Sequence, residues 1–135
     1  MPASILDIEG VGAAFAAKLK AAGVSTVEAL LEKGATPKSR EALAAQTGID
    51  QGKILEWVNH ADLFRIRGVS TQYSDLLEAS GVDTVVELAQ RNPANLHARL
   101  IEVNEEKHLV RLVPAISQVE AWIEHAKSLP RVVTY

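Results

Sequence analysis

Apolar residues recur along most of the chain with the three-to-four-residue spacing of helices. In the last such segment, four apolar residues share one stripe: Ile116, Val119, Ile123 and Ala126. Trp122 lies beside this stripe, and the charged residues Glu124 and Lys127 face away from it. No segment alternates with the two-residue period of a strand, apart from the tail 131–135. The pattern predicts an all-α fold and leaves open whether the tail after Pro130 is ordered or loose.

Residues that cap helices mark where these helices begin and end. Thr36 and Asn92 each precede a proline, which pairs an N-cap residue with proline at the first helical position. Gly23 and Gly81 occupy places where a left-handed residue ends a helix. These residues predict two helix starts and two helix ends.

Three further helix starts are predicted from polar residues ahead of apolar runs. Ser25 opens a Ser-Thr-Val-Glu capping box, and Asp83 has the same place without the reciprocal glutamate. The segment from Ser117 to Glu120 opens the last helix.

The chain repeats itself. A shift of 58 residues (68 − 10) lays Gly10 over Gly68, and ten of the 23 positions in 8–30 then meet identical residues. Trp57 recurs at Trp122 with a shift of 65 (122 − 57), so the second copy has gained about seven residues. We therefore predict a first unit at 1–62, a second unit at 63–130 with an insertion near 102–114, and a tail at 131–135.

Composition and charge exclude several classes of function. The chain has no cysteine, which removes disulfides, thiolate nucleophiles and cysteine-ligated zinc. It shows no nucleophile elbow, paired carboxylates, phosphate loop or dinucleotide fingerprint, and no His or carboxylate set with metal-ligand spacing. We expect no enzyme activity, no metal and no small-molecule cofactor. Because no long apolar run or leader pattern is visible, we expect a cytoplasmic protein without membrane contact.

The Gly-Val-Gly pivot at 10–12 has two interpretations. A tight turn of the form apolar-x-Gly-apolar-Gly needs glycine where φ is positive or where backbones approach closely. The same turn leaves backbone N–H groups at the start of a helix, and these can hold a phosphate.

The residues around this pivot resemble a known family. Ile-Glu-Gly-Val-Gly at 8–12 is followed by a helical pattern and by Ala-Ala-Gly-Val-Ser-Thr-Val at 21–27. This resembles the tandem helix-hairpin-helix domain, whose units occur in recombinase N-terminal domains and in the C-terminal domain of the RNA polymerase alpha subunit. The segment 45–50 with Lys53 is similar to a second hairpin, and 66–70 is similar to the first hairpin of a second unit. The two-copy arrangement is similar to an uncharacterised bacterial family, a domain of unknown function.

The resemblance implies two helix-hairpin-helix units packed as a pseudo-repeat in one compact body. It also implies contact with the backbone of duplex or structured DNA, without sequence preference. The residues carried over to that role are Gly10, Gly12, Gly48, Gly68 and Ser70 as amide donors, with Lys53, Arg65 and Arg67 as cations. Arg65 and Arg67 flank the turn at 66–70, and Lys53 lies on the helix leading toward that turn. We therefore expect 68–72 to be the main phosphate-binding segment.

The charges favour an alternative, a protein-interaction or scaffold module in which the hairpins are purely structural. The net charge is −3 and the pI is near 5.8, below the range typical of nucleic-acid binders. Ala14 and Gln72 stand where such hairpins often carry a cation, and Glu9 and Asp50 would repel a phosphate. A protein partner would then dock on an apolar groove or on the tail 131–135.

Overall fold

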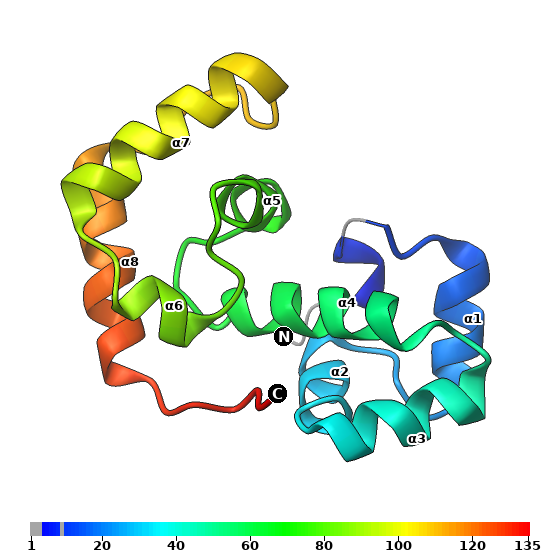
Figure 1. Ribbon diagram of the computed structural model, residues 1–135. Helices are drawn as coiled ribbons and strands as arrows, with labels where there is room; N and C mark the ends of the chain where they lie inside the picture. Colours follow the sequence, from blue (N-terminus) through cyan, green and yellow to red (C-terminus); the bar gives the residue numbers. More distant parts are fainter. Residues whose placement is uncertain (1–3, 9) are drawn as a thin grey trace. The chain divides into compact units, whose positions relative to one another are not determined.

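The computed structural model describes residues 4–8 and 10–135 (Figure 1). Within them the chain forms helices and no strand, apart from an isolated bridge between Ser4 and Thr26. The predicted all-α class is therefore confirmed for this part of the chain. The elements are the 3-10 helix η1 (Ile5–Asp7) and the α-helices α1 (Ala13–Ala21), α2 (Val27–Lys33), α3 (Pro37–Thr47), α4 (Gln51–Leu63), α5 (Thr71–Ala79), α6 (Val85–Ala89), α7 (Pro93–Lys107) and α8 (Ile116–Ser128).

The chain forms two structural units. Unit 1 holds the described residues up to Asp62 together with Val132–Tyr135, and unit 2 holds Leu63–Arg131. Helices α1 to α3 lie in unit 1 and α5 to α8 in unit 2, while α4 ends at the first residue of unit 2. No described helix is both long and apolar enough to cross a bilayer.

In unit 1, α1 and α2 both pack against α3 and against η1. Helix α4 contributes Trp57 and Val58 to the buried interior of this unit. The other large buried side chains of unit 1 include Ile5, Ile8, Leu19, Leu30 and Ile54. This aliphatic core is what the low aromatic content of the sequence allows, and it holds α1 and its preceding turn in place.

In unit 2, α8 packs against α6 and α7, and α5 packs against α7. Val119, Trp122, Ile123 and Ala126 on α8 are all buried, as the sequence stripe predicts. Ile116 is 43% exposed, so its predicted place on the buried stripe is wrong. It is the first residue of α8, where the helix has only just begun to cover the core.

The caps next to prolines and the glycine helix ends are confirmed. The Thr36 side chain accepts a hydrogen bond from the Ser39 N–H, and the Asn92 side chain accepts one from the Asn95 N–H. Gly23 and Gly81 have φ angles of 86° and 92°. These positions depend only on a few neighbouring residues, which is why the sequence locates them correctly.

Three predicted helix starts are wrong by one or two residues. The caps of α2 and α6 are Thr26 and Thr84, each accepting from the N–H three residues on, and not Ser25 and Asp83. Both threonines are extended, and each follows a polar residue that is also a good cap, so local preference alone does not choose between the two.

Helix α8 starts ahead of the predicted Ser117. It begins at Ile116 after Ala115, whose N–H donates to the Gln118 Oε1 atom. Alanine offers no side-chain acceptor, so the cap-forming residues that mark other helix starts are missing here.

The C-terminal tail is held against unit 1, which settles a question that the sequence left open. Val133 is buried, and the Thr134 N–H donates to the Ala35 carbonyl at 2.8 Å. The partners lie almost a hundred residues away along the chain, and no local sequence pattern marks such a contact.

Candidate nucleic-acid interface

The first pivot is a turn whose shape is fixed by a buried tryptophan. Gly10 has φ +91°, and a Cβ atom there would lie 3.4 Å from Trp57 Nε1. The Val11 N–H donates to the Ile8 carbonyl at 3.1 Å, which closes the turn. Glycine is therefore required at position 10 by its dihedral angle, and the space beside it is tight.

The second glycine of this pivot has no such requirement. Gly12 is the N-cap of α1, with φ −86° and ψ −179°, and a Cβ atom there would meet nothing within 4 Å. No side-chain cap bond is made at this helix start. The first turn of α1 therefore presents its N–H groups beside an uncrowded glycine, and such amides attract anions.

The pivot of unit 2 has the same backbone. Gly68 has φ +88°, and a Cβ atom there would lie 3.3 Å from Trp122 Nε1. The Val69 N–H donates to the Ile66 carbonyl at 3.1 Å. Ser70 is the N-cap of α5, and its Oγ atom accepts from the Tyr73 N–H at 3.5 Å. The serine thus supplies an acceptor for one of the amides that a phosphate would need.

Two lysines lie near the same aromatic ring, that of Phe15 in the first turn of α1. Lys18 Nζ is 6.0 Å and Lys53 Nζ is 5.8 Å from the centre of the Phe15 ring. Phe15 in turn packs edge-on against Trp57, with ring centres 5.1 Å apart. Such cation–π contacts hold the ammonium groups near the start of α1.

Lys53 thus contacts an aromatic ring of unit 1, whereas the sequence analysis grouped it with the turn at 66–70. The sequence analysis did not name Lys18, which is one helical turn after Phe15 on α1, a spacing that brings two side chains together.

The arginines of unit 2 have other contacts. The Arg65 Nη2 group donates to the Pro130 carbonyl at 2.8 Å. The Arg67 N–H donates to His125 Nδ1 at 3.1 Å, while the Arg67 side chain is exposed. Arg67 is the better placed of the two arginines to meet an anion.

At the turn after Gly48, a side chain of the protein itself accepts from the backbone N–H that a phosphate would need. Gly48 has φ +74° and ends α3, and the Asp50 Oδ2 atom accepts from the Lys53 N–H at 3.3 Å. This carboxylate caps the start of α4 and carries the wrong charge for a phosphate. Glu9, the other acidic residue set against phosphate binding, lies outside the described residues.

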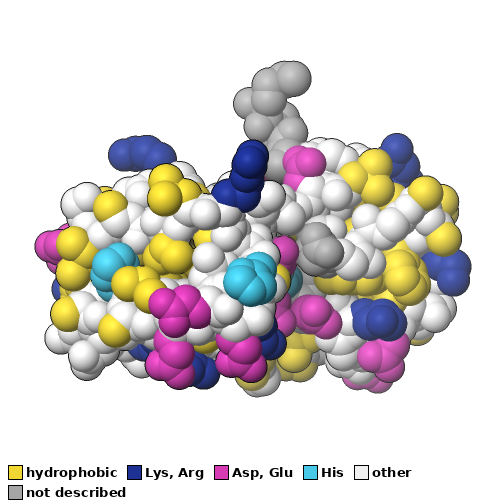
Figure 2. All heavy atoms as spheres, turned by 90° about the horizontal axis from the view of Figure 1, so that it is seen from above, with side chains coloured by type: hydrophobic (Ala, Val, Ile, Leu, Met, Phe, Trp, Pro, Cys, Tyr) yellow, Lys and Arg dark blue, Asp and Glu magenta, His cyan; other side chains and the backbone are white. Residues whose placement is uncertain are grey.

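The charges on the surface are mixed. On the face drawn in Figure 2, Lys and Arg side chains stand apart from one another, with Asp and Glu side chains among them. On that face no broad basic surface is seen.

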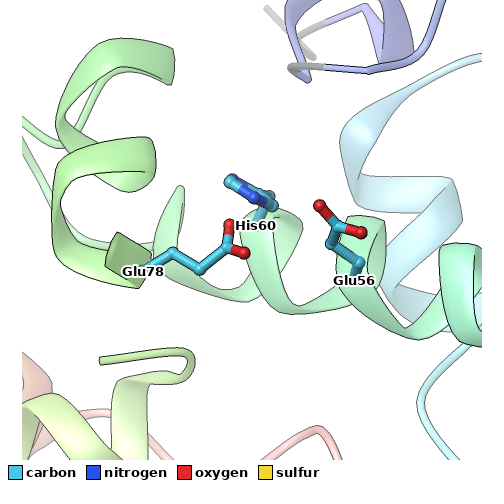
Figure 3. Close-up of side chains that lie close together, drawn as sticks. All are labelled: Glu56, His60 and Glu78. Carbon is cyan, nitrogen blue, oxygen red and sulfur yellow. The ribbon is translucent and has the colours of Figure 1, made fainter. Parts of the chain in front are cut away.

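Glu56 and His60 are four residues apart on α4, a spacing that brings two possible metal ligands together and that the sequence analysis did not name. Glu56 and His60 project from adjacent turns of α4 (Figure 3), and His60 is buried. Glu78, also labelled there, belongs to α5 of unit 2. Two groups are fewer than the three protein ligands that catalytic zinc sites use.

Comparison with known families gives one match. Residues 9–129 match the family described as "Domain of unknown function (DUF4332)", and the chain belongs to that family. No curated protein and no solved structure matches the chain.

Proposed function

We propose that this protein is a non-enzymatic module of two tandem helix-hairpin-helix units, related as a pseudo-repeat, that contacts the DNA backbone without reading sequence. The observation that carries the proposal is the uncapped start of α1 beside Gly12, with Lys18 and Lys53 close to it. Such a role would place the protein in the cytoplasm.

The chemistry of this helix start suits a phosphate. The N-terminal end of a helix carries about half a positive charge, concentrated on amides without partners in the helix. Lysine supplies a mobile point charge that binds phosphate without directional demands. Gly12 has room in front of it, so a phosphate oxygen can approach the backbone closely.

Unit 2 supports the same contact more weakly. Gly68 and Ser70 repeat the backbone of the first pivot, and Arg67 is exposed beside it. The Ser70 hydroxyl competes for an amide, and Tyr73, in the place of Phe15, packs against Trp122 with ring centres 5.3 Å apart. We therefore assign the main contact to unit 1 and a supporting contact to unit 2.

The test is fluorescence anisotropy of labelled duplex and single-stranded DNA, titrated with the protein at several salt concentrations. The double variant Lys18→Ala with Lys53→Ala should weaken binding and lower the slope of log K against log salt by about 0.9 for each lost phosphate contact. Lys38→Ala with Lys107→Ala removes the same charge from exposed sites elsewhere and serves as the control. Equal loss in both double variants would mean that net charge acts, and not the pivot.

A second candidate function is a protein-interaction module. Leu112, in the connection between α7 and α8, is 78% exposed, and the net charge of the chain is −3. An apolar side chain so exposed suits a protein contact better than a phosphate contact. Absence of DNA binding even at low salt would favour this candidate.

A further inference from the structure

The tail Val132–Tyr135 packs as part of unit 1 (Figure 1). Val133 is 3% exposed, so its side chain forms part of the interior. The Thr134 N–H donates to the Ala35 carbonyl, in the connection between α2 and α3. The Tyr135 hydroxyl donates to Asn59 Oδ1 at 3.0 Å, on α4. The tail is thus fixed at three successive residues to two different parts of unit 1.

Arg40 joins the tail to the body of unit 1. Its guanidinium donates from Nη1 to the Gly34 carbonyl at 2.8 Å and from Nη2 to the Thr134 carbonyl at 2.6 Å. The Arg40 side chain is only 3% exposed, and its Cζ atom lies 5.8 Å from the centre of the Tyr135 ring. Burial lowers the pKa of Arg40, but an arginine remains charged at neutral pH. The buried cation is therefore stabilised by carbonyls that the tail helps to supply.

The chain passes between the units twice. It first passes at Asp62 and Leu63, inside α4, and it returns at Arg131 and Val132, just after the exposed Pro130. The first passage is a continuous helix. The second depends on a few hydrogen bonds and one buried valine, set against the entropy of ordering four residues. Segments held so lightly open without unfolding the whole protein.

We propose that Val132–Tyr135 is a detachable strap, which closes on unit 1 and whose release uncovers the Arg40 guanidinium and the place of Val133 in the interior of that unit. Arg40 is the latch of this strap, because it bonds the tail and the α2–α3 connection at once. The proposal does not depend on DNA binding, and its test contains no nucleic acid.

The test measures release of the strap from unit 1. Thr134→Pro removes the N–H that bonds Ala35, whereas Thr134→Ala keeps it and serves as the matched control. Trypsin cuts after the exposed Arg131 only when the following residues are free to enter the protease. Cleavage there, followed by mass spectrometry, should speed up about tenfold or more in Thr134→Pro, because proteolysis follows the open population. Thr134→Ala should remain within about twofold of the parent. Circular dichroism checks that both keep their helices.

An unchanged cleavage rate after Arg131 in Thr134→Pro, with its helices intact, would overturn the strap. Equal acceleration in Thr134→Pro and Thr134→Ala would overturn the role given to the Thr134 N–H.

Discussion

The two glycine pivots share a backbone and differ in the chemistry around it. Gly10 and Gly68 have φ angles of 91° and 88°, and each faces the indole nitrogen of a buried tryptophan in its own unit. The side chains that surround them differ: Lys18 and Lys53 lie by the first, whereas Tyr73 at the second packs against Trp122. The comparison shows that packing against tryptophan fixes the shape of the turn, while residues outside that contact are free to vary.

The second position of each pivot teaches the same lesson. Gly12 and Ser70 have φ angles of −86° and −88°, in extended backbone that any residue adopts. Glycine is therefore not required there by conformation, and serine replaces it without strain. What changes is the cap, because Ser70 accepts from an amide that Gly12 leaves to other acceptors.

A third pair of positions, the left-handed residues that end α3 and α7, shows that another residue can replace glycine even at a positive φ. Gly48 ends α3 with φ 74°, and His108 ends α7 with φ 52°. Histidine is among the non-glycine residues that adopt this region more readily. The segment after α7 therefore turns without any glycine. The Asn104 side chain supports it by bonding both the N–H and the carbonyl of Val110.

The strongest way to break the comparison is to remove the tryptophans. Trp57→Ala and Trp122→Ala should each lower the free energy of unfolding by about 3–5 kcal/mol, the usual cost of truncating a buried aromatic residue. Chemical denaturation with circular dichroism measures the loss. Leu112→Ala, at a side chain that is 78% exposed, controls for loss of apolar mass. A loss below about 1 kcal/mol at either tryptophan would contradict the role assigned to it.

An intermediate loss in the free energy of unfolding should distinguish Gly10 from Gly12. Gly10→Ala should cost about 1–3 kcal/mol, because alanine is strained at a positive φ and its methyl group would approach Trp57 Nε1. Gly12→Ala is the matched control and should cost less than about 1 kcal/mol, since only its extended backbone must accept a side chain. Thermal unfolding of the two variants measures the difference, and equal losses would sink the distinction.

The smallest effect on stability comes from making the first pivot resemble the second. Gly12→Ser supplies a side-chain cap for α1 and should raise the free energy of unfolding by a few tenths of a kcal/mol. Under the proposed function, the same variant should weaken DNA binding. The new serine hydroxyl would accept a hydrogen bond from a backbone N–H that would otherwise donate to phosphate. Denaturation and anisotropy on the same preparation test both. Stronger or unchanged DNA binding would argue against amide contact at this helix start.

The sequence by itself determined the features that depend on neighbouring residues. Thr36 and Asn92 were identified as caps because proline follows them, and Gly23 and Gly81 because glycine favours the left-handed conformation that ends a helix. The buried stripe of α8 followed from the helical period of its apolar residues. The predicted DNA-contacting role of the pivot residues stays a prediction.

Only the tertiary structure decided features that join distant parts of the chain. Lys18 and Lys53 meet at Phe15 because α1 and α4 pack in one unit, which no local spacing reveals. The tail packs on unit 1 because Arg40 finds the Thr134 carbonyl across 94 residues of sequence. Contacts of this kind depend on how whole helices pack, since packing sets which side chains become neighbours, and a single sequence records only the residues that lie next to one another.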